Sequence, residues 1–190
     1  MCLVVYRDET VKTTLLYRLT DDEWEEEIRE DLENLQLIGI EIESVTSDGG
    51  NNIIKAVKKA CPNAIRQRCL AHIQRECLTW ITKHPQSEAG RELRKIVCMI
   101  CLIKTHNDKL QWISDFKNWS EKYKDYLNEK TFKEESHREW YTHKMVRRAY
   151  VHIMKALPDM FHFLDFRLIY LLFLRGITNC FWQHYQFFHF

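Results

Sequence analysis

The feature that most constrains the fold is the alternation of short strands and amphipathic helices over the first 84 residues. Two apolar stretches, residues 2–6 and 13–19, flank a polar turn and predict a β-hairpin. Residues 37–48 are rich in Ile and Val and predict a strand, and residues 64–69 predict another. With the intervening helices, the order is β-β-α-β-α-β-α, which is typical of an α/β fold.

The helices in this region have recognisable starts and apolar faces. Thr20 and Glu23 match a capping box, and Asn51 is a suitable N-cap for the helix that follows Gly50. Apolar residues then recur at helical spacing, which predicts the buried stripes of the two helices: Trp24, Ile28, Leu32 and Leu35 in the first, and Ile53, Ile54, Val57 and Cys61 in the second.

The pattern changes after about residue 85, where long helical periods replace the strands. Residues 90–104 predict a buried helix that holds Cys98 and Cys101 in its core, and residues 108–130 predict an amphipathic helix. Residues 136–160 predict a third long helix. We therefore expect three parts: an α/β core over 1–84, a helical lobe over 85–160, and a tail over 161–190.

The tail differs in composition from the rest of the chain. It holds 11 aromatic residues and only three charged ones, and it shows neither a period of two nor one of 3.6. A globular domain rarely exposes so much aromatic surface. Either the tail packs on the core or it is not in the original coding frame, and the second explanation is favoured.

Composition indicates a globular chain, and its charge is unevenly distributed between an acidic and a basic segment. The sequence is 45% hydrophobic and 29% charged. Residues 1–49 carry 4 Lys/Arg and 14 Asp/Glu, whereas residues 50–110 carry 12 and 4. The basic segment fits a surface that contacts nucleic acid phosphates, but the charge pattern alone favours the alternative of a solvated helix surface. The candidate DNA-binding residues are Lys55, Lys58, Lys59, Arg66, Arg68 and Arg75.

Cysteine usage and hydropathy indicate a cytoplasmic, reducing location. The seven cysteines are an odd number without a disulfide framework, and no signal peptide is recognisable at Met1. The apolar run at residues 168–174 is too short to span a membrane. We therefore expect no membrane association.

Asp48 is the strongest candidate for a catalytic and metal-binding residue. It ends a predicted strand and precedes two glycines, and open α/β sheets bind ligands at such positions. A carboxylate there suits a hard cation such as Mg²⁺. The alternative is an aspartate that caps the following helix, which is a common arrangement.

Cys69 and His72 form a Cys-x-x-His pair at the next predicted strand–helix junction. Such a pair can supply two zinc ligands, but Cys77 and His84, the conceivable partners, lie at poor spacing. The alternative is that both side chains pack and form hydrogen bonds at the junction.

Taken together, these motifs resemble the central block of insertion-sequence transposases of the Mutator-like class. The matching elements are Asp48-Gly49, Pro62-Asn63-Ala64, Gln67-Arg68-Cys69 and His72, in order and spacing. Residues 138–164 also resemble the helix that closes the insertion lobe in a bacterial, variant zinc-binding subgroup, so the resemblance covers about 1–165.

The resemblance implies a fold, a chemistry and partners. The fold is an RNase H-like core, a mixed sheet with flanking helices, with an all-α insertion lobe. An Asp-Asp-Glu (DDE) triad would hold Mg²⁺ or Mn²⁺ for DNA strand cleavage and transfer. Asp48 corresponds to the second triad member, and Cys69 and His72 to a site-supporting element. The partners would be transposon ends and target DNA, and an intact member would act as a homodimer.

Two departures from the family pattern affect the function that we expect. No strand bearing the first triad aspartate precedes residues 2–6, and no glutamate follows Glu139. We therefore expect a transposase fragment that is inactive alone, with an internal start and a frame shift near Asp165. The alternatives are a non-enzymatic nucleic-acid-binding or zinc-stabilised module, and a decaying reading frame without function.

Overall fold

The computed structural model describes residues 2–8, 11–134, 137–165 and 171–178, with the side chains of Lys133 and of 171–178 excluded. The chain forms two compact units. The first unit comprises Met1–Ile65 and Ile169–Phe190, and the second comprises Arg66–Leu168. The boundary that the sequence suggested at 84/85 is a change from alternating strands and helices to helices alone. The division into two compact units falls earlier, within strand β4 (Ile65–Arg68).

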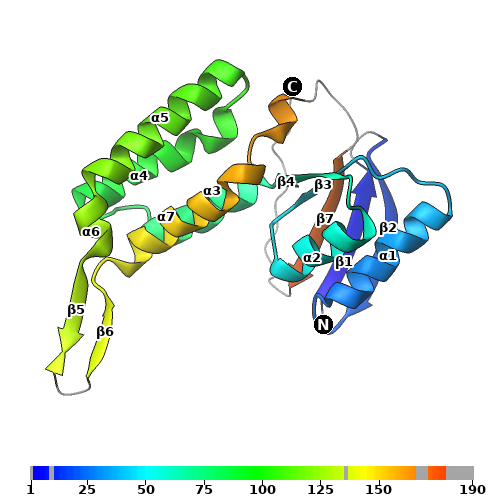
Figure 1. Cartoon of the computed structure of the whole chain (residues 1–190), viewed down its shortest axis with the longest axis horizontal. Helices are drawn as coiled ribbons and strands as arrows, with labels where there is room; N and C mark the ends of the chain where they lie inside the picture. The colour runs from blue at the N-terminus through cyan, green and yellow to red at the C-terminus, as the bar shows by residue number, and fades with distance from the viewer. Residues whose placement is uncertain (1, 9–10, 135–136, 166–170, 179–190) are drawn as a thin grey trace. The chain divides into compact units, whose positions relative to one another are not determined.

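The first unit is built on a mixed five-stranded sheet with the order β2-β1-β7-β3-β4 (Figure 1). The predicted order β-β-α-β-α-β-α is confirmed, and the chain is α/β. The strands are β1 Cys2–Asp8, β2 Thr13–Thr20, β3 Ser44–Ser47, β4 Ile65–Arg68 and β7 Leu171–Thr178.

Strand directions follow from the backbone pairing. β1 is antiparallel to β2, with Val4 opposite Arg18, and it is antiparallel to β7, with Val4 opposite Gly176. β3 is parallel to β7. Consequently β2, β7 and β3 run in the same direction, and their carboxyl ends lie at the same edge of the sheet.

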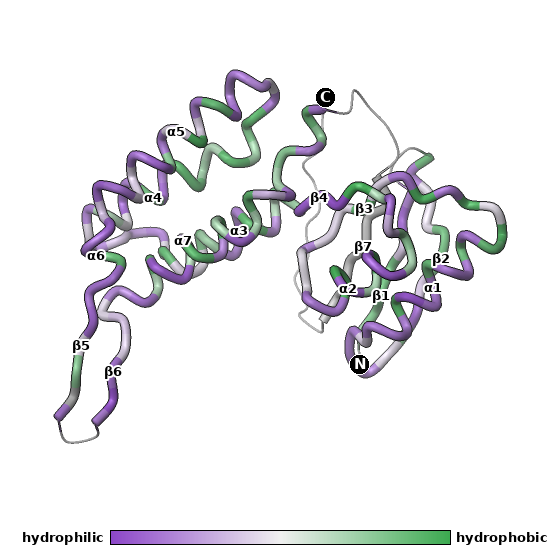
Figure 2. Tube along the Cα trace, viewed as in Figure 1, coloured by the Kyte–Doolittle hydropathy of each residue, from purple (hydrophilic) through white to green (hydrophobic). Residues whose placement is uncertain are grey.

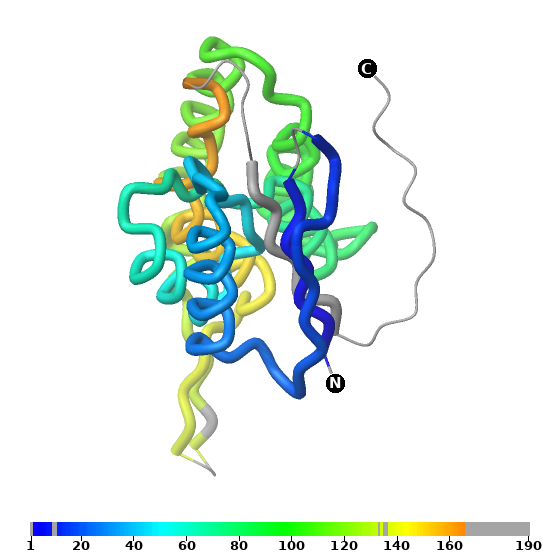
Figure 3. The backbone as a smooth tube through the Cα atoms, turned by 90° about the vertical axis from the view of Figure 1, so that its right-hand side faces the viewer, coloured from blue at the N-terminus to red at the C-terminus, as the bar shows by residue number. Residues whose placement is uncertain are grey.

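Two helices, α1 Glu25–Leu37 and α2 Asn51–Ala60, pack on one face of this sheet (Figures 1 and 3). The core between sheet and helices is apolar, because alternate residues of β1 point to that face. Its fully buried members include Tyr6, Leu32 and Ala56. The predicted apolar stripes of both helices are confirmed, except that Trp24 is exposed and precedes its helix.

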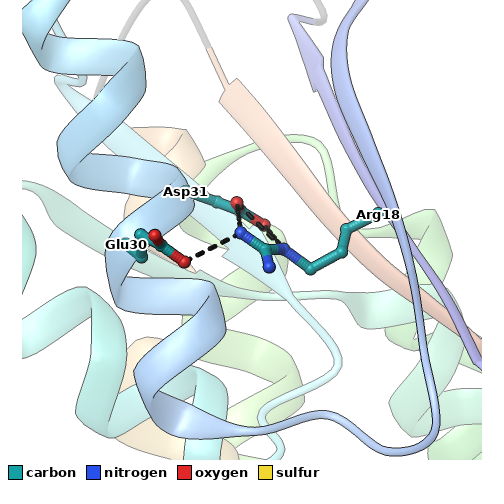
Figure 4. A network of polar contacts seen from close by, with 3 residues as sticks. All are labelled: Arg18, Glu30 and Asp31. Atoms are coloured by element: carbon teal, nitrogen blue, oxygen red, sulfur yellow. Dashed lines mark hydrogen bonds and ion pairs between the residues drawn. The ribbon is translucent and has the colours of Figure 1, made fainter.

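One buried ion pair joins the sheet to α1. Arg18 on β2 donates from Nε to both carboxylate oxygens of Asp31, at 3.0 and 2.9 Å, and from Nη2 to Glu30 at 3.0 Å (Figure 4). Asp31 is only 3% exposed. A buried carboxylate requires such a partner, because an unpaired charge in this environment is costly.

The second unit is helical with one hairpin. Its long helices are amphipathic, and hydrophobic and hydrophilic residues alternate along each of them (Figure 2). They bury a core that includes Leu93, Trp112, Phe116 and Ile153. The elements are α3 Leu70–Ile81, α4 Glu88–Met99, η1 Ile100–Leu102, α5 His106–Lys122, α6 Lys124–Asn128, β5 Lys130–Lys133, β6 Arg138–Tyr141, α7 Lys144–Ala156, η3 Leu157–Asp159 and η4 His162–Leu164.

Several local predictions were wrong. The capping box at Thr20 is absent, since α1 begins at Glu25 and Trp24 occupies the N-cap without a side-chain bond. Gly50 rather than Asn51 is the N-cap of α2. The predicted third helix over 136–160 begins only at Lys144, because Arg138–Tyr141 pair as strand β6.

The cysteines that we placed in the core of a buried helix are on the surface. Cys98 is exposed because it lies off the buried face of α4, which Leu93 and Val97 form, and Cys101 is exposed in η1 after α4 ends at Met99. The tail that we expected to be aberrant supplies β7 from Leu171–Thr178, while residues 166–170 and 179–190 lie outside the described part. Within the described residues, no helix is both long and apolar enough to cross a membrane.

Candidate functional site

Asp48 lies at the carboxyl end of β3, in the first unit. All four residues of β3 are buried, so the strand is held firmly and Asp48 emerges half-buried at the sheet edge. Helix α2 begins three residues later at Asn51. The prediction that Asp48 ends a strand and precedes a helix is confirmed.

The turn after Asp48 is tightened by side-chain hydrogen bonds. The Gly50 N–H donates to Asp48 Oδ1 at 2.9 Å, and the Gly49 N–H donates to Ser47 Oγ at 3.2 Å. Gly49 has φ +85°, a conformation that glycine adopts without steric cost. Asp48 therefore closes a turn before α2 through one carboxylate oxygen and does not cap the helix, whose N-cap is Gly50.

Glu23 is the second carboxylate near this turn. A Cβ added at Gly50 would lie 3.5 Å from Asp48 Oδ1 and 3.6 Å from Glu23 Oε2, so the two carboxylates face the same glycine. Burial, and then the negative charge of Asp48, raise the pKa of Glu23. The segment is fixed by Asn52 Nδ2, which donates to the Glu23 carbonyl at 2.8 Å.

The sequence analysis missed Glu23 as a site residue because it assigned this side chain to a capping box. Strand direction could have found it. Glu23 follows β2 and Asp48 follows β3, and both strands end at the same edge of the sheet. Hairpin pairing alone, however, does not reveal the direction of β3 relative to β2.

The oxygen donors of this pair fit a hard divalent cation such as Mg²⁺ or Mn²⁺. Gly50 keeps the space between the carboxylates clear of a side chain. No three His, Cys, Asp or Glu side chains of the described residues are grouped so that they could hold a metal ion. Asp48 and Glu23 could therefore supply at most part of a ligand set.

Cys69 and His72 lie at the β4–α3 junction, in the second unit. Cys69 is the N-cap of α3 and is half-buried. His72 Nδ1 lies 2.9 Å from Arg75 Nη2, and its Nε2 lies 3.4 Å from Glu76 Oε1. His72 thus has partners consistent with a side chain that is packed and hydrogen-bonded.

The zinc partners that the sequence suggested are poorly suited to that role. Cys77 is buried, its Sγ donates to the Ala149 carbonyl, and burial raises its pKa to about 12, which disfavours the thiolate that zinc requires. His84 is exposed in the loop after α3.

His152 is a further titratable group beside this junction. Its Nε2 lies 3.5 Å from Glu76 Oε2, and its ring packs edge-on against Trp80 with the ring centroids 5.2 Å apart. Burial lowers the pKa of His152, and the positive charges of Arg68 and Arg148 lower it further, against the effect of Glu76. These effects favour the neutral imidazole of His152 over its protonated form.

The candidate DNA-binding residues have different surroundings. Lys55 and Lys59 both pair with Glu25, and Arg66 Nη2 lies 3.9 Å from Asp159. Lys58 is exposed on α2, and Arg75 is exposed on α3 beside His72. Arg68 is buried. The Lys55 and Lys59 side chains are exposed, so their ion pairs with Glu25 add little stability.

A model of the Mutator family of transposases matches residues 6–163 of the 190. The chain belongs to this family. The match runs from β1 through η4 and so includes both Asp48 and the Cys69–His72 pair. The resemblance noted from the sequence motifs is confirmed. Comparisons with curated proteins and with solved structures give no significant match.

Proposed function

We propose that this Mutator-family chain acts in DNA transposition through a metal-dependent site of the Asp-Asp-Glu type on an RNase H-like core, with Asp48 as a metal-binding carboxylate. The observation that carries the proposal is the position of Asp48, at the carboxyl end of a buried strand in a family of transposases. The mixed sheet covered by α1 and α2 is compatible with that core.

The chemistry that we propose is phosphodiester cleavage and strand transfer. Bound divalent cations would supply an activated water or DNA 3′-hydroxyl and would stabilise the attacking and leaving oxygens. Asp48 and Glu23 are the side chains of this chain that would hold the cation. Glu23 must lose its proton to bind a cation. Because its pKa is raised, cation affinity should increase with pH.

We further propose that the site is too weak for catalysis by this chain alone. Two carboxylates leave most positions of a divalent cation to water, and the described residues bring no third ligand. DNA would be held through phosphate contacts, for which the exposed residues among the predicted cations are Lys55, Lys58, Lys59 and Arg75.

Iron-mediated backbone cleavage tests this assignment without requiring enzymatic activity. With Fe²⁺ and ascorbate, we expect the full chain to be cut near residues 23 and 48, and we expect Asp48→Asn to abolish both cuts. Asp22→Asn is the matched control, because Asp22 is an exposed neighbour. Cuts that persist in Asp48→Asn would refute the assignment.

The competing function is a zinc-stabilised binding module. It would be supported if the purified chain held stoichiometric zinc that Cys69→Ser removes, with no iron-mediated cut near Asp48. Absence of zinc together with Asp48-dependent cleavage would favour the transposase site.

A further inference from the structure

The hairpin β5–β6 extends from the helices of the second unit as a two-stranded sheet (Figures 1 and 3). Its base is firmly attached. The Thr131 and Thr142 hydroxyls lie 2.7 Å apart, the Thr142 N–H donates to the Glu129 carbonyl at 3.0 Å, and the Arg147 guanidinium lies 3.7 Å from the centre of the Tyr141 ring. An isolated hairpin is only marginally stable in water, so these contacts must position it.

The strand register places two large aromatic side chains on opposite faces of the hairpin. Phe132 pairs with Glu139, and Trp140 pairs with Thr131. Cross-strand partners share a face, and successive residues alternate between faces. Phe132 is 58% exposed and Trp140 is 43% exposed. Each face therefore presents an aromatic group to solvent.

The two faces differ in charge. On the Phe132 side, Lys130 and Glu139 form an ion pair at 3.0 Å, so the charges that the two strands contribute to that face cancel. On the other side, Arg138 lies two residues before Trp140 and therefore shares its face, together with Thr131. This Trp140 face, defined as Thr131, Arg138 and Trp140, carries a cation and, among the residues of the paired strands, no acid.

We propose that the Trp140 face is a DNA-contact surface, which rests on the transposase function proposed above. A guanidinium beside an indole matches the two parts of a DNA strand, because the cation pairs with phosphate and the ring packs on sugar or base. A two-stranded ribbon also has the width that the major groove of B-DNA admits. The strand residues of the Phe132 face offer no such unpaired cation, because Lys130 is paired with Glu139.

Fluorescence anisotropy with a labelled 30-base-pair duplex tests the proposal on the full chain. We expect Trp140→Ala to weaken binding roughly tenfold. Phe132→Ala is the matched control, since it truncates an exposed aromatic on the same hairpin, and we expect a change of less than about twofold. Arg138→Gln should lower the slope of log affinity against log salt by about one.

The outcomes separate this inference from the proposed function. If the wild-type chain binds no DNA, both fail. If it binds and Trp140→Ala binds equally well, or if Phe132→Ala loses as much affinity as Trp140→Ala, the hairpin inference alone is overturned. Self-association that Trp140→Ala abolishes, with DNA affinity unchanged, would also overturn it and would assign the face to a second copy of the chain.

Discussion

At the scale of single residues, the buried pair of Arg18 and Asp31 offers a sharp stability test. Arg18→Ala leaves the Asp31 carboxylate buried without its main cation, and we expect the free energy of unfolding to fall by about 2–3 kcal/mol. Arg29→Ala is the control. Arg29 and Glu33 form an exposed pair on the same helix, whose loss should cost less than about 0.5 kcal/mol. Equal losses in urea unfolding would contradict the special role of Asp31.

His152 predicts a pH dependence of stability. Its pKa in the folded state lies below the usual 6.5, so the unfolded chain takes up the proton first as pH falls. The stability that His152 contributes is therefore complete above about pH 6.5 and decreases as the pH drops toward the folded pKa. In urea unfolding, the free energy of unfolding should differ less between pH 7.5 and pH 5.5 for His152→Gln than for the wild-type chain. An unchanged difference would exclude His152 as the source.

Residue-scale predictions from the sequence succeeded where a side chain is fixed by its own strand or helix. Asp48 was placed correctly because an apolar strand followed by two glycines determines where its backbone turns. Glu23 was missed because its environment depends on Gly50 and Asp48, which are distant in sequence. The pairing of Lys55 and Lys59 with Glu25 was missed for the same reason.

At the scale of elements, the start of α5 is set by a reciprocal capping box. The Thr105 side chain accepts from the Asp108 N–H, and the Asp108 side chain accepts from the Thr105 N–H. Thr105→Ala should lower the free energy of unfolding by about 1 kcal/mol. Ser120→Ala, near the other end of the same helix, removes a hydroxyl that only bonds the Lys117 carbonyl, and it should have little effect. If the unfolding temperature falls equally in both variants, loss of the cap does not explain the destabilisation of Thr105→Ala.

Element boundaries were predicted well for helices with clean apolar stripes and poorly where short elements meet. Hydrophobic spacing placed α2 correctly, since its buried residues Ile53 and Val57 lie on one face. Strand β6 was predicted as helix and β5 was not predicted, because their side chains are mostly exposed and no apolar alternation marks the strands. Cys101 was misplaced because the end of α4 at Met99 carries no Gly or Pro signal, and Cys98 because α4 buries only one face, on which Leu93 and Val97 lie.

At the scale of the whole molecule, β7 links the end of the chain to its beginning. It lies between β1 and β3, so its removal would leave two unpaired strand edges in the middle of the sheet. We expect truncation after Leu168 to cause aggregation of the purified chain, as measured by size-exclusion chromatography. Truncation after Thr178 retains β7 and should leave the elution unchanged. Identical behaviour of both truncations would contradict a structural role for β7.

The sequence predicted an α/β unit and a helical region, because alternation of strand and helix periods is local information. It did not predict that part of the tail would complete the sheet, since pairing between distant strands depends on tertiary packing. The position of β7 between β1 and β3 is therefore known only from the structure.

The most direct test of the central claim is calorimetric titration of the full chain with MnCl₂. We predict a dissociation constant on the order of 1 mM that Asp48→Asn and Glu23→Gln each weaken further, because two carboxylates supply only part of a cation's ligands. Binding on the order of 1 μM, or binding that neither substitution changes, would contradict the claim that Asp48 and Glu23 form an incomplete metal site.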